Sequence, residues 1–270
     1  MTAGRPRTGL TMAAPGFQRP TLEALRQDPA IRRIVRDHRR LTRACAEAAR
    51  DPQRSTVVAC SGGADSLALL LALAVTPIPI VAAHVVHDIR AEREALADRD
   101  HVRSIAAILA VPFCEASVSA RTPGNLERNA RRVREAALAR IARDQRARFI
   151  ATGHHADDVL ETMLMRLARG AGPRGLAGPH PTRRLGSEPN DPWIVRPMLG
   201  VSRIDTERIC SIAGVEWRHD TTNDDTALLR NAIRARVVPH LKAMAPGVEH
   251  RAARAAELLR GASEVLTERA

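Results

Sequence analysis

Short runs of β-branched and small apolar residues alternate with longer helical segments over residues 56–167, and this alternation limits the possible folds more than any other feature. The expected strands are 56–60, 78–86, 113–118 and 149–152, and the expected helices are 66–74, 91–110, 126–145 and 156–167. Strands separated by helices are joined by crossover connections, which make neighbouring strands parallel and cover both faces of the sheet. The sequence therefore predicts an α/β fold with a doubly wound, mainly parallel sheet.

Composition shifts along the chain predict four regions. We expect disorder over 1–20, a basic helical arm over 21–54, the α/β domain over 55–215 and a helical C-terminal segment that completes the domain over 216–270. The first region has no acid and no apolar periodicity, whereas the second has apolar residues at helical spacing. Within the domain, 170–192 is rich in Gly and Pro and should be a long functional loop, and 193–195 should be an edge strand.

The composition also narrows the class of protein. A chain of 270 residues that is 44% hydrophobic and 27% charged can bury a sizeable core, and its apolar runs are too short to cross a bilayer. The start of the sequence lacks a charged-then-apolar leader, and the four cysteines lie too far apart for zinc, iron–sulfur or disulfide patterns. We therefore expect a cytoplasmic protein with no membrane partner.

The charge balance points to a polyanionic partner. The formal net charge is +12, and residues 1–54 alone hold 12 basic and five acidic side chains. In a chain of this kind nucleic acid is the first candidate. With three Phe, two Trp and no Tyr, base stacking on an aromatic platform is not expected.

The strongest local signal is Ser-Gly-Gly-Ala-Asp-Ser at 61–66, between the first strand and its helix. Glycines let backbone N–H groups approach phosphate oxygens, and the helix dipole favours an anion at the helix start. Asp65 would repel a phosphate unless a cation lay between them, so we assign it to Mg²⁺. The phosphate donors would come from Ser61, Gly62, Gly63, Ala64 and Ser66. The alternative is a tight turn with Asp65 as a helix cap.

A second cluster of chemistry follows the fourth strand. Asp157, Asp158 and Glu161 would lie on one side of a helix near its start. Clustered carboxylates repel one another, so they need a cation, either Mg²⁺ (with Asp158 as a ligand), a substrate ammonium, or both. Such a carboxylate can also accept a proton from an amine before it attacks. The alternative is that these acids only offset the helix dipole.

Several histidines and arginines stand at positions where a doubly wound fold places ligand contacts. His154 and His155 lack a third ligand at zinc spacing, so we expect them to line the site or to serve as polar loop residues. His84 is either a ligand contact or a buried, satisfied histidine. Arg131 and Arg134 share a helix face and would clamp phosphates or belong to a solvated face.

These motifs together resemble a known family. Residues 61–66 match the SGGxDS loop of the N-type ATP pyrophosphatases, the PP-loop superfamily. Similarity to the tRNA(Ile)-lysidine synthetases extends through HVVHDIR at 84–90, NLERNARRVR at 125–134, GHHADDVLET at 153–162, RGAGPRGL at 169–176, RPML at 196–199, DTTN at 220–223, RNAIR at 230–234 and VP at 238–239. The sequence departs from the family pattern at Glu135, where tyrosine is usual, and at Val86, where aspartate is usual.

The resemblance implies a Rossmann-like PP-loop fold and an ATP-dependent carbon–nitrogen ligase. ATP with Mg²⁺ would adenylate the wobble cytidine of tRNA(Ile) with a CAU anticodon, releasing pyrophosphate, and the ε-amine of L-lysine would then displace AMP. It implies catalytic roles for Asp65, Asp157, Asp158 and Glu161, ATP contacts at 61–66, His84, Arg131 and Arg134, and lysine or tRNA contacts at His154, His155, Arg196, Arg230 and Arg234.

Two alternatives to this function remain open, and the oligomeric state is open as well. The chain could be a related tRNA thiolase, although that chemistry usually needs a cysteine pair, or a tRNA-binding homologue with an inactive loop. It could form a homodimer. Because the larger C-terminal domains of many members are absent from this sequence, we also expect the basic arm over 21–54 to take over part of the grip on tRNA.

Overall fold

The computed structural model describes residues 19–49, 55–88, 92–119, 126–188, 190–218 and 229–268. The segment expected to be disordered, 1–20, lies outside these residues except for Arg19 and Pro20, which begin the first helix. The motif residues Arg90 and Asn125 and the segment 220–223 also lie outside them.

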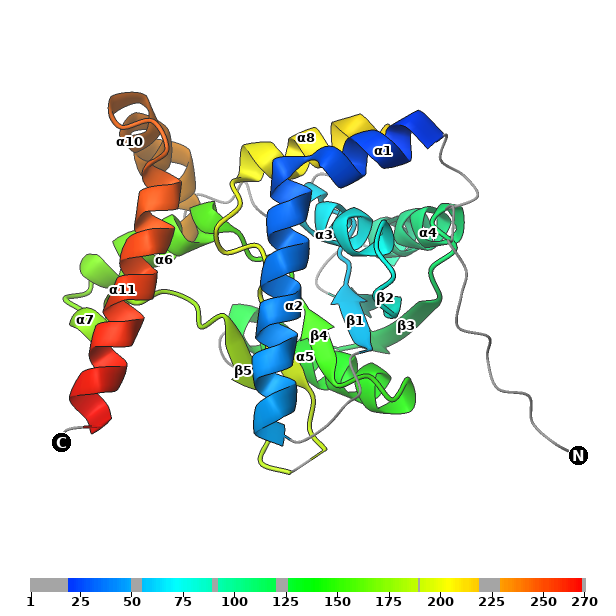
Figure 1. The fold of residues 1–270 in the computed structure, drawn as a ribbon, viewed down its shortest axis with the longest axis horizontal. Helices are drawn as coiled ribbons and strands as arrows, with labels where there is room; N and C mark the ends of the chain where they lie inside the picture. The colour runs from blue at the N-terminus through cyan, green and yellow to red at the C-terminus, as the bar shows by residue number, and fades with distance from the viewer. Residues whose placement is uncertain are drawn as a thin grey trace, which may run out of the picture.

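The predicted parallel sheet is present and has six strands (Figure 1). They are β1 (Thr56–Ala59), β2 (Ile80–His87), β3 (Phe113–Val118), β4 (Phe149–Ala151), β5 (Thr182–Arg184) and β6 (Trp193–Val195). The order is β3-β2-β1-β4-β6-β5, and every pairing is parallel except β5 with β6. The loop after β1 therefore lies at the centre of the sheet.

Two predictions about the second half of the sheet are wrong. Residues 193–195 are not an edge strand, because β6 pairs with β4 on one side and with β5 on the other. The segment 170–192 is not one long loop, because it contains β5 and the short helix α7 (Pro173–Leu176). β5 was missed because its Thr-Arg-Arg sequence lacks the apolar alternation of a strand, and only its backbone pairing with β6 makes it one.

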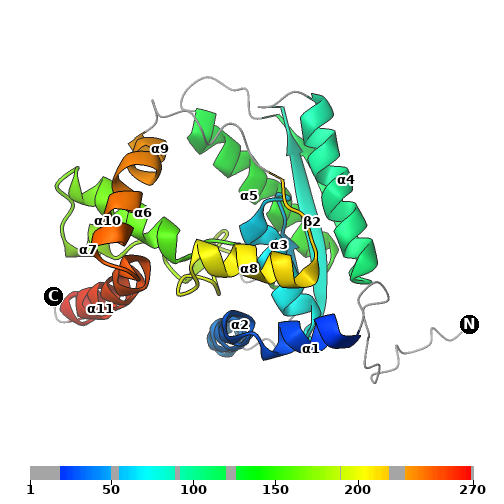
Figure 2. The same ribbon diagram turned by 90° about the horizontal axis from the view of Figure 1, so that it is seen from above.

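Helices cover both faces of the sheet. Besides α7, the helices within the described residues are α1 (Arg19–Gln27), α2 (Pro29–Ala49), α3 (Ala64–Ala74), α4 (Glu92–Ile108), α5 (Leu126–Asp144), α6 (Ala156–Leu167), α8 (Arg203–Ala213), α9 (Leu229–Ala232), α10 (Val238–Met244) and α11 (Val248–Glu268), with a π-helical turn over Ile233–Val237. The last three, α9 to α11, lie beside the sheet and do not cover it. Figure 2 shows α4 and α5 on opposite sides of the sheet. Alternate strand residues point to opposite faces, so Val57 and Ile150 pack beneath α5, whereas Val58 and Ala151 join the core that contains α3.

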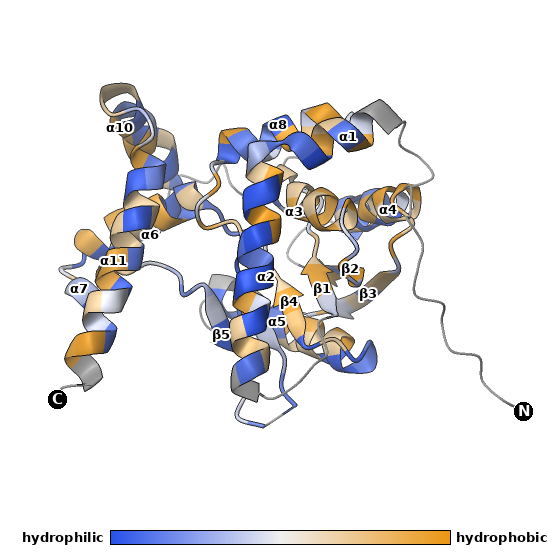
Figure 3. Ribbon diagram, in the orientation of Figure 1, coloured by the Kyte–Doolittle hydropathy of each residue, from blue (hydrophilic) through white to orange (hydrophobic). Residues whose placement is uncertain are grey.

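Of the basic segment expected over 21–54, the structure describes residues 21–49, and these are helical and packed into the domain core. Leu25, Ile31 and Ile34 are buried at 0–2% exposure and belong to the same core as α3. Figure 3 shows the result, with α3 largely hydrophobic and α2 carrying hydrophobic and hydrophilic residues on different sides. α1 and α2 are therefore part of the domain, and their charged residues lie on its outer surface.

The C-terminal segment forms a helical layer beside the sheet. α11 packs against α6 and α7, and a small separate core joins Leu160 of α6 to Ile233, Val238 and Ala252. These contacts place α11 along α6 and α7, as Figure 1 shows. None of the helices within the described residues is long and apolar enough to span a membrane.

Candidate active site

The loop over 60–66, which we call the glycine-pair loop, has a backbone conformation that depends on the first of its two glycines. Gly62 has φ +94°, a backbone conformation that favours glycine, and Gly63 has the extended conformation of a helix N-cap before α3. A Cβ on Gly62 would come within 3.7 Å of Val102 and of the Asp98 carbonyl oxygen. The free N–H groups at the start of α3 therefore lie at the carboxyl end of β1, in the middle of the sheet.

The two loop serines have different surroundings. Ser66 is buried, and its Oγ accepts a hydrogen bond from the Ser61 N–H (3.1 Å) and donates one to the Gly63 carbonyl (3.0 Å). Ser61 is exposed, and its Oγ lies 3.3 Å from Ser66 Oγ. Ser66 thus shapes the loop, and Ser61 remains open to a ligand.

His84 of β2 contacts the backbone of the glycine-pair loop at Cys60. Its side chain is 5% exposed, and Nδ1 lies 2.9 Å from the Cys60 carbonyl oxygen, so we assign the proton to Nδ1. Burial lowers the pKa of His84 below 6.5, which keeps the imidazole neutral at pH 7. These contacts match the buried, satisfied histidine, and an ATP contact of His84 stays a prediction.

The turn between β4 and α6 comes against the glycine-pair loop. A Cβ on Gly153 would lie 3.0 Å from the Asp65 backbone carbon and oxygen and 3.2 Å from the Ser66 nitrogen. Only glycine fits this approach without displacement of the backbone. Gly153 therefore allows the two motifs, which are almost 90 positions apart in the sequence, to form one site.

His155 joins the carboxylates of both motifs. Its Nε2 lies 3.3 Å from Asp65 Oδ2 and 3.6 Å from Asp158 Oδ2, and Thr206 donates to Asp65 Oδ1 (2.7 Å). Burial alone would lower the pKa of His155, but Asp158, Asp157 and Asp65 raise it well above 6.5. The imidazole is therefore protonated at pH 7 and lies between the two acidic residues predicted to bind Mg²⁺.

Asp157 holds three helices together. It is 5% exposed, Oδ2 accepts from the Arg203 N–H at the start of α8 (2.9 Å), and Oδ1 accepts from Lys242 Nζ in α10. Burial would raise the pKa of Asp157, but its bonds to His155, Lys242 and Arg203 lower it below the ordinary value. These contacts are structural, and the predicted catalytic role of Asp157 has no further support.

Asp158 and Glu161 are paired with the two arginines predicted to bind lysine or tRNA. Arg230 contacts Asp158 Oδ1 (2.6 Å) and Glu161 Oε2 (2.9 Å), and Arg234 contacts Glu161 Oε1 (2.6 Å) and Oε2 (3.0 Å). Glu161 is 2% exposed, so its charge requires partners of this kind. Burial would raise the pKa of Asp158, but His155 and Arg230 lower it to about 2.

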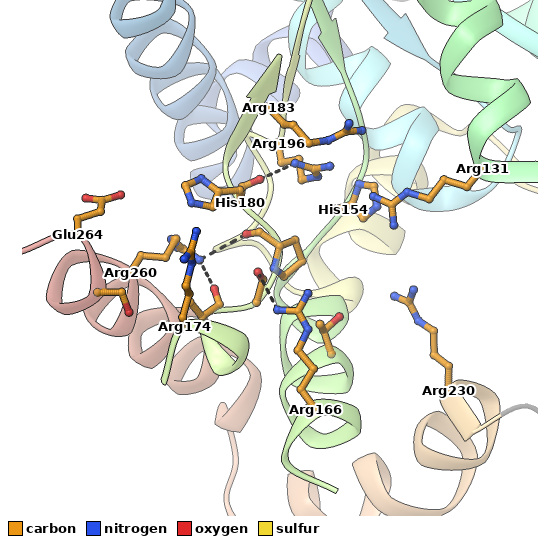
Figure 4. A pocket seen from close by; sticks show the side chains of 15 residues that line it. Arg131, His154, Arg166, Arg174, His180, Arg183, Arg196, Arg230, Arg260 and Glu264 are labelled. Atoms are coloured by element: carbon orange, nitrogen blue, oxygen red, sulfur yellow. Dashed lines mark hydrogen bonds between the residues drawn. The ribbon is translucent and has the colours of Figure 1, made fainter. Parts of the chain in front are cut away.

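A basic cavity of about 670 Å³ opens beside this ion-pair network (Figure 4). The seven arginines that line it are Arg131, Arg166, Arg174, Arg183, Arg196, Arg230 and Arg260. Glu264 is the single acid among the described lining residues, and His154 also lines the wall. The structure thus brings four predicted residues from four motifs, Arg131, His154, Arg196 and Arg230, into one cavity.

Some of these arginines also hold the cavity wall. Arg166 and Arg260 donate to carbonyls of the 175–179 turn, and Arg196 donates to the His180 carbonyl (2.5 Å). Burial and Arg131 lower the pKa of Arg196 to about 10, so it stays charged at pH 7. Burial also lowers the pKa of His154 to about 3, which makes His154 a neutral member of the wall.

The family departure at Glu135 has a structural counterpart. Glu135 Oε1 lies 3.2 Å from Arg131 Nε in α5 and 2.7 Å from Arg183 in β5, and it joins two sides of the cavity. Arg134, one turn from Arg131, is exposed and does not line the cavity. The shared face predicted for the two arginines therefore does not give them a shared environment.

Sequence reasoning gave no role in the site to four of its residues: Gly153, Glu135, Thr206 and Lys242. Thr206 lies inside a helix with no motif to mark it. Lys242 could have been found, because it is the single lysine among 42 basic residues.

The donor set fits Mg²⁺ held mainly by Asp65. Both oxygens of each carboxylate already have protein partners, but the Asp65 side chain is 33% exposed beside the N–H groups at the start of α3, whereas the Asp158 side chain is 11% exposed. Mg²⁺ commonly takes one or two carboxylates together with phosphate oxygens. Within the described residues no three His, Cys, Asp or Glu side chains form a metal cage.

Comparison with known proteins gives consistent matches. Residues 34–241 match the model of the PP-loop domain family. The tRNA(Ile)-lysidine synthase of Geobacter sulfurreducens is 39% identical over 218 residues, which cover 77% of this chain and 44% of that protein. The tRNA(Ile)-lysidine synthase of Salinispora arenicola is 41% identical over 223 residues, which cover 79% of this chain and 65% of that protein.

A solved structure shares the fold. The U34-tRNA thiolase NcsA from Methanococcus maripaludis, with its [4Fe-4S] cluster, aligns with a TM-score of 0.61 at 16% identity over 77% of this chain and 72% of that chain. The chain spans about half to two-thirds of the length of the curated relatives it matches.

Proposed function

We propose that this chain, which belongs to the PP-loop domain family, is an ATP-dependent ligase that joins L-lysine to the wobble cytidine of tRNA(Ile). The observation that carries the proposal is the contact of Asp65 with His155 and of His155 with Asp158. It joins a phosphate-binding loop to a cluster of carboxylates beside a basic cavity. The names of the curated relatives supply the substrate class.

The first half-reaction uses the glycine-pair loop. The N–H groups at the start of α3 and the open hydroxyl of Ser61 bind the triphosphate of ATP, and Asp65 is the residue that would hold Mg²⁺. Mg²⁺ supplies positive charge that offsets the charge of the pyrophosphate leaving group. The oxygen of the wobble cytidine attacks the α-phosphate, an adenylated base forms, and pyrophosphate leaves.

The second half-reaction uses the carboxylates of α6. The ammonium of lysine is attracted to Asp158 and Glu161. After it has released a proton to solvent, the amine attacks the ring carbon that carries the adenylated oxygen. A C–N bond forms, the bond between that carbon and the oxygen breaks, and AMP leaves with the oxygen. Because the pKa of Asp158 is about 2, this residue anchors an ammonium better than it accepts a proton. Arg230 and Arg234 already neutralise both acids, so lysine must share these oxygens with the arginines.

The basic cavity receives the RNA. Its arginines supply donors for phosphates next to the target base, and Arg230 links the cavity to Asp158. Reaction at a base of an anticodon loop requires that base to be turned out of its stack, and single-stranded loops allow this at moderate cost.

The thiolase alternative has less support. The likeness to NcsA concerns the fold alone at 16% identity. Burial raises the pKa of the Cys60 and Cys210 thiols to about 12, so neither provides a thiolate at neutral pH. An inactive tRNA-binding homologue would release no pyrophosphate and transfer no lysine, so the assay below distinguishes it from a ligase.

The test is incubation of the full chain with ATP, Mg²⁺, isotope-labelled lysine and a tRNA(Ile) transcript with a CAU anticodon. Pyrophosphate release and an RNA mass increase of one lysine residue are expected. Asp65→Asn keeps an oxygen for the Thr206 hydrogen bond and should abolish pyrophosphate release, whereas Asp100→Asn on the exposed face of α4 should not. No lysine in the RNA, or full activity of Asp65→Asn, would refute the proposal.

A further inference from the structure

A second basic surface lies on the outer face of α1 and α2, away from the basic cavity. Six arginines surround a groove of about 520 Å³, which we call the α2 groove: Arg26, Arg32, Arg36, Arg39, Arg40 and Arg43. Its floor contains Ile31 and Val35 of α2 and the segment Val75 and Thr76 after α3.

The positive charge of the α2 groove is poorly compensated within the described residues. Among the described residues, Asp37 is the one acid that pairs with these arginines, at 3.4 Å from Arg36 and 3.8 Å from Arg40. The side chains of Arg36 and Arg40 are 69% and 63% exposed, so these surface pairs remove little of the positive potential. Arginines crowded in this way repel one another unless a polyanion lies over them.

The arginines are held on a rigid support. Arg26 Nε donates to the Val75 carbonyl (3.2 Å), and Arg32 Nε donates to the Arg26 carbonyl (3.2 Å). The opposite side of α2 is fixed in the core through Ile31 and Ile34. From Arg32 to Arg43 the helix rises about 16 Å, which corresponds to roughly five phosphates along one strand of a duplex.

Burial of the apolar face of α2 selects among possible polyanions. A helix that lies on a membrane inserts its apolar face between lipids. In α2 that face is occupied, because Ile31, Ile34 and Leu41 are 0–5% exposed. The exposed side of α2 carries arginines and offers no apolar side chains to insert into a membrane. Such a surface suits contacts with the phosphates of a nucleic acid, which do not depend on its base sequence.

We propose that the α2 groove binds the sugar-phosphate backbone of the RNA substrate at a distance from the reacting base. The inference rests on the proposed function, from which it takes the RNA. The groove ends at the C-terminal end of α3, and the glycine-pair loop lies at the N-terminal end, about 16 Å away along the helix. That is about half a helical turn of duplex, so a stem can contact the α2 groove while its loop reaches the active site.

The test compares two variants with the same change of charge. Arg36→Gln/Arg39→Gln/Arg43→Gln removes three charges from the α2 groove. Arg93→Gln/Arg99→Gln/Arg103→Gln removes three from α4, and thermal unfolding checks that both variants are folded. Binding of the tRNA(Ile) transcript is measured by fluorescence anisotropy in 50–300 mM KCl, a range of about sixfold in salt.

The α2 variant should bind roughly 100-fold more weakly in about 0.1 M salt, and its slope of log K against log salt should fall by about 2–3. The α4 variant should keep the wild-type slope. If both variants lost the same affinity for the transcript, the loss would be explained by net charge alone, and the proposal would be overturned. So would α2-dependent binding to vesicles containing anionic lipid with no effect on RNA binding.

The two proposals fail in different ways. If the wild-type chain transfers no lysine but still shows α2-dependent RNA binding, the ligase function fails and the docking surface stands. If lysine transfer occurs and the α2 variant binds RNA like the wild type, the docking surface fails alone. Deletion of residues 1–52 tests neither, because it removes Leu25, Ile31 and Ile34 from the core.

Discussion

Replacement of Gly153 by alanine tests the contact between the two halves of the site. The added Cβ would lie 3.0 Å from the Asp65 backbone carbon and oxygen, and these atoms cannot rotate away as a side chain can. Restoring ordinary contact needs a shift of about 0.5 Å between the β4–α6 turn and α3, and overpacking of this kind costs about 1–3 kcal/mol. For a chain of this size, a loss of about 2 kcal/mol lowers Tm by roughly 4–8 °C.

The same shift would separate His155 from Asp65, which are now 3.3 Å apart. Misplacement of site residues by a fraction of an ångström up to about 1 Å can reduce the rate by up to about 100-fold, so pyrophosphate release should fall with Tm. Gly172→Ala is the matched control, because Gly172 has φ −73° and no heavy atom within 4 Å of the added Cβ. It should leave Tm unchanged or raise it slightly. A Gly153→Ala variant with wild-type Tm and rate would refute the reasoning.

Three further predictions concern the charged residues. Glu161→Gln should lower the free energy of unfolding in urea by about 1–3 kcal/mol, because Arg234 loses its bidentate partner and Arg230 keeps Asp158 alone. Glu207→Gln on the surface should change it by less than about 1 kcal/mol. Asp158 has a lowered pKa of about 2, so its contribution to stability is present above about pH 5 and is lost as the pH falls towards 2; the difference between wild type and Asp158→Asn in urea should shrink over that window. Glu135→Gln removes the one carboxylate shared by Arg131 and Arg183, so tRNA binding by anisotropy should become tighter with a steeper salt slope, and an unchanged slope would count against RNA in the basic cavity.

Much of the fold could be predicted from local pattern. The strands at 113–118 and 149–151 and the helix at 156–167 lie within one residue of their predicted bounds. Each has a clear apolar pattern, and the parallel order follows from strand–helix alternation. β5 could not be predicted in this way, because pairing with β6, and not its own sequence, gives it a strand conformation.

The sequence predicts which motifs come together better than it predicts how their side chains interact. The glycine-pair loop and the start of α6 do lie in contact, but the sequence does not say that His155 becomes a cation between Asp65 and Asp158. Nor does it say that Arg230 and Arg234 neutralise Asp158 and Glu161. Such roles depend on distances between residues far apart in the chain, which local periodicity does not encode.

The position of these arginines in the chain has a consequence for synthesis. Arg230 follows Asp158 by 72 residues, and Arg234 follows Glu161 by 73. A ribosome that adds about 5–20 residues per second would need roughly 4–15 s to supply them. During that interval the carboxylates at the start of α6 have no arginine partners and are costly to bury. This part of α6 should therefore become buried only after residues 230–234 have been made, and a ribosome-bound chain that ends before residue 230 should be inactive.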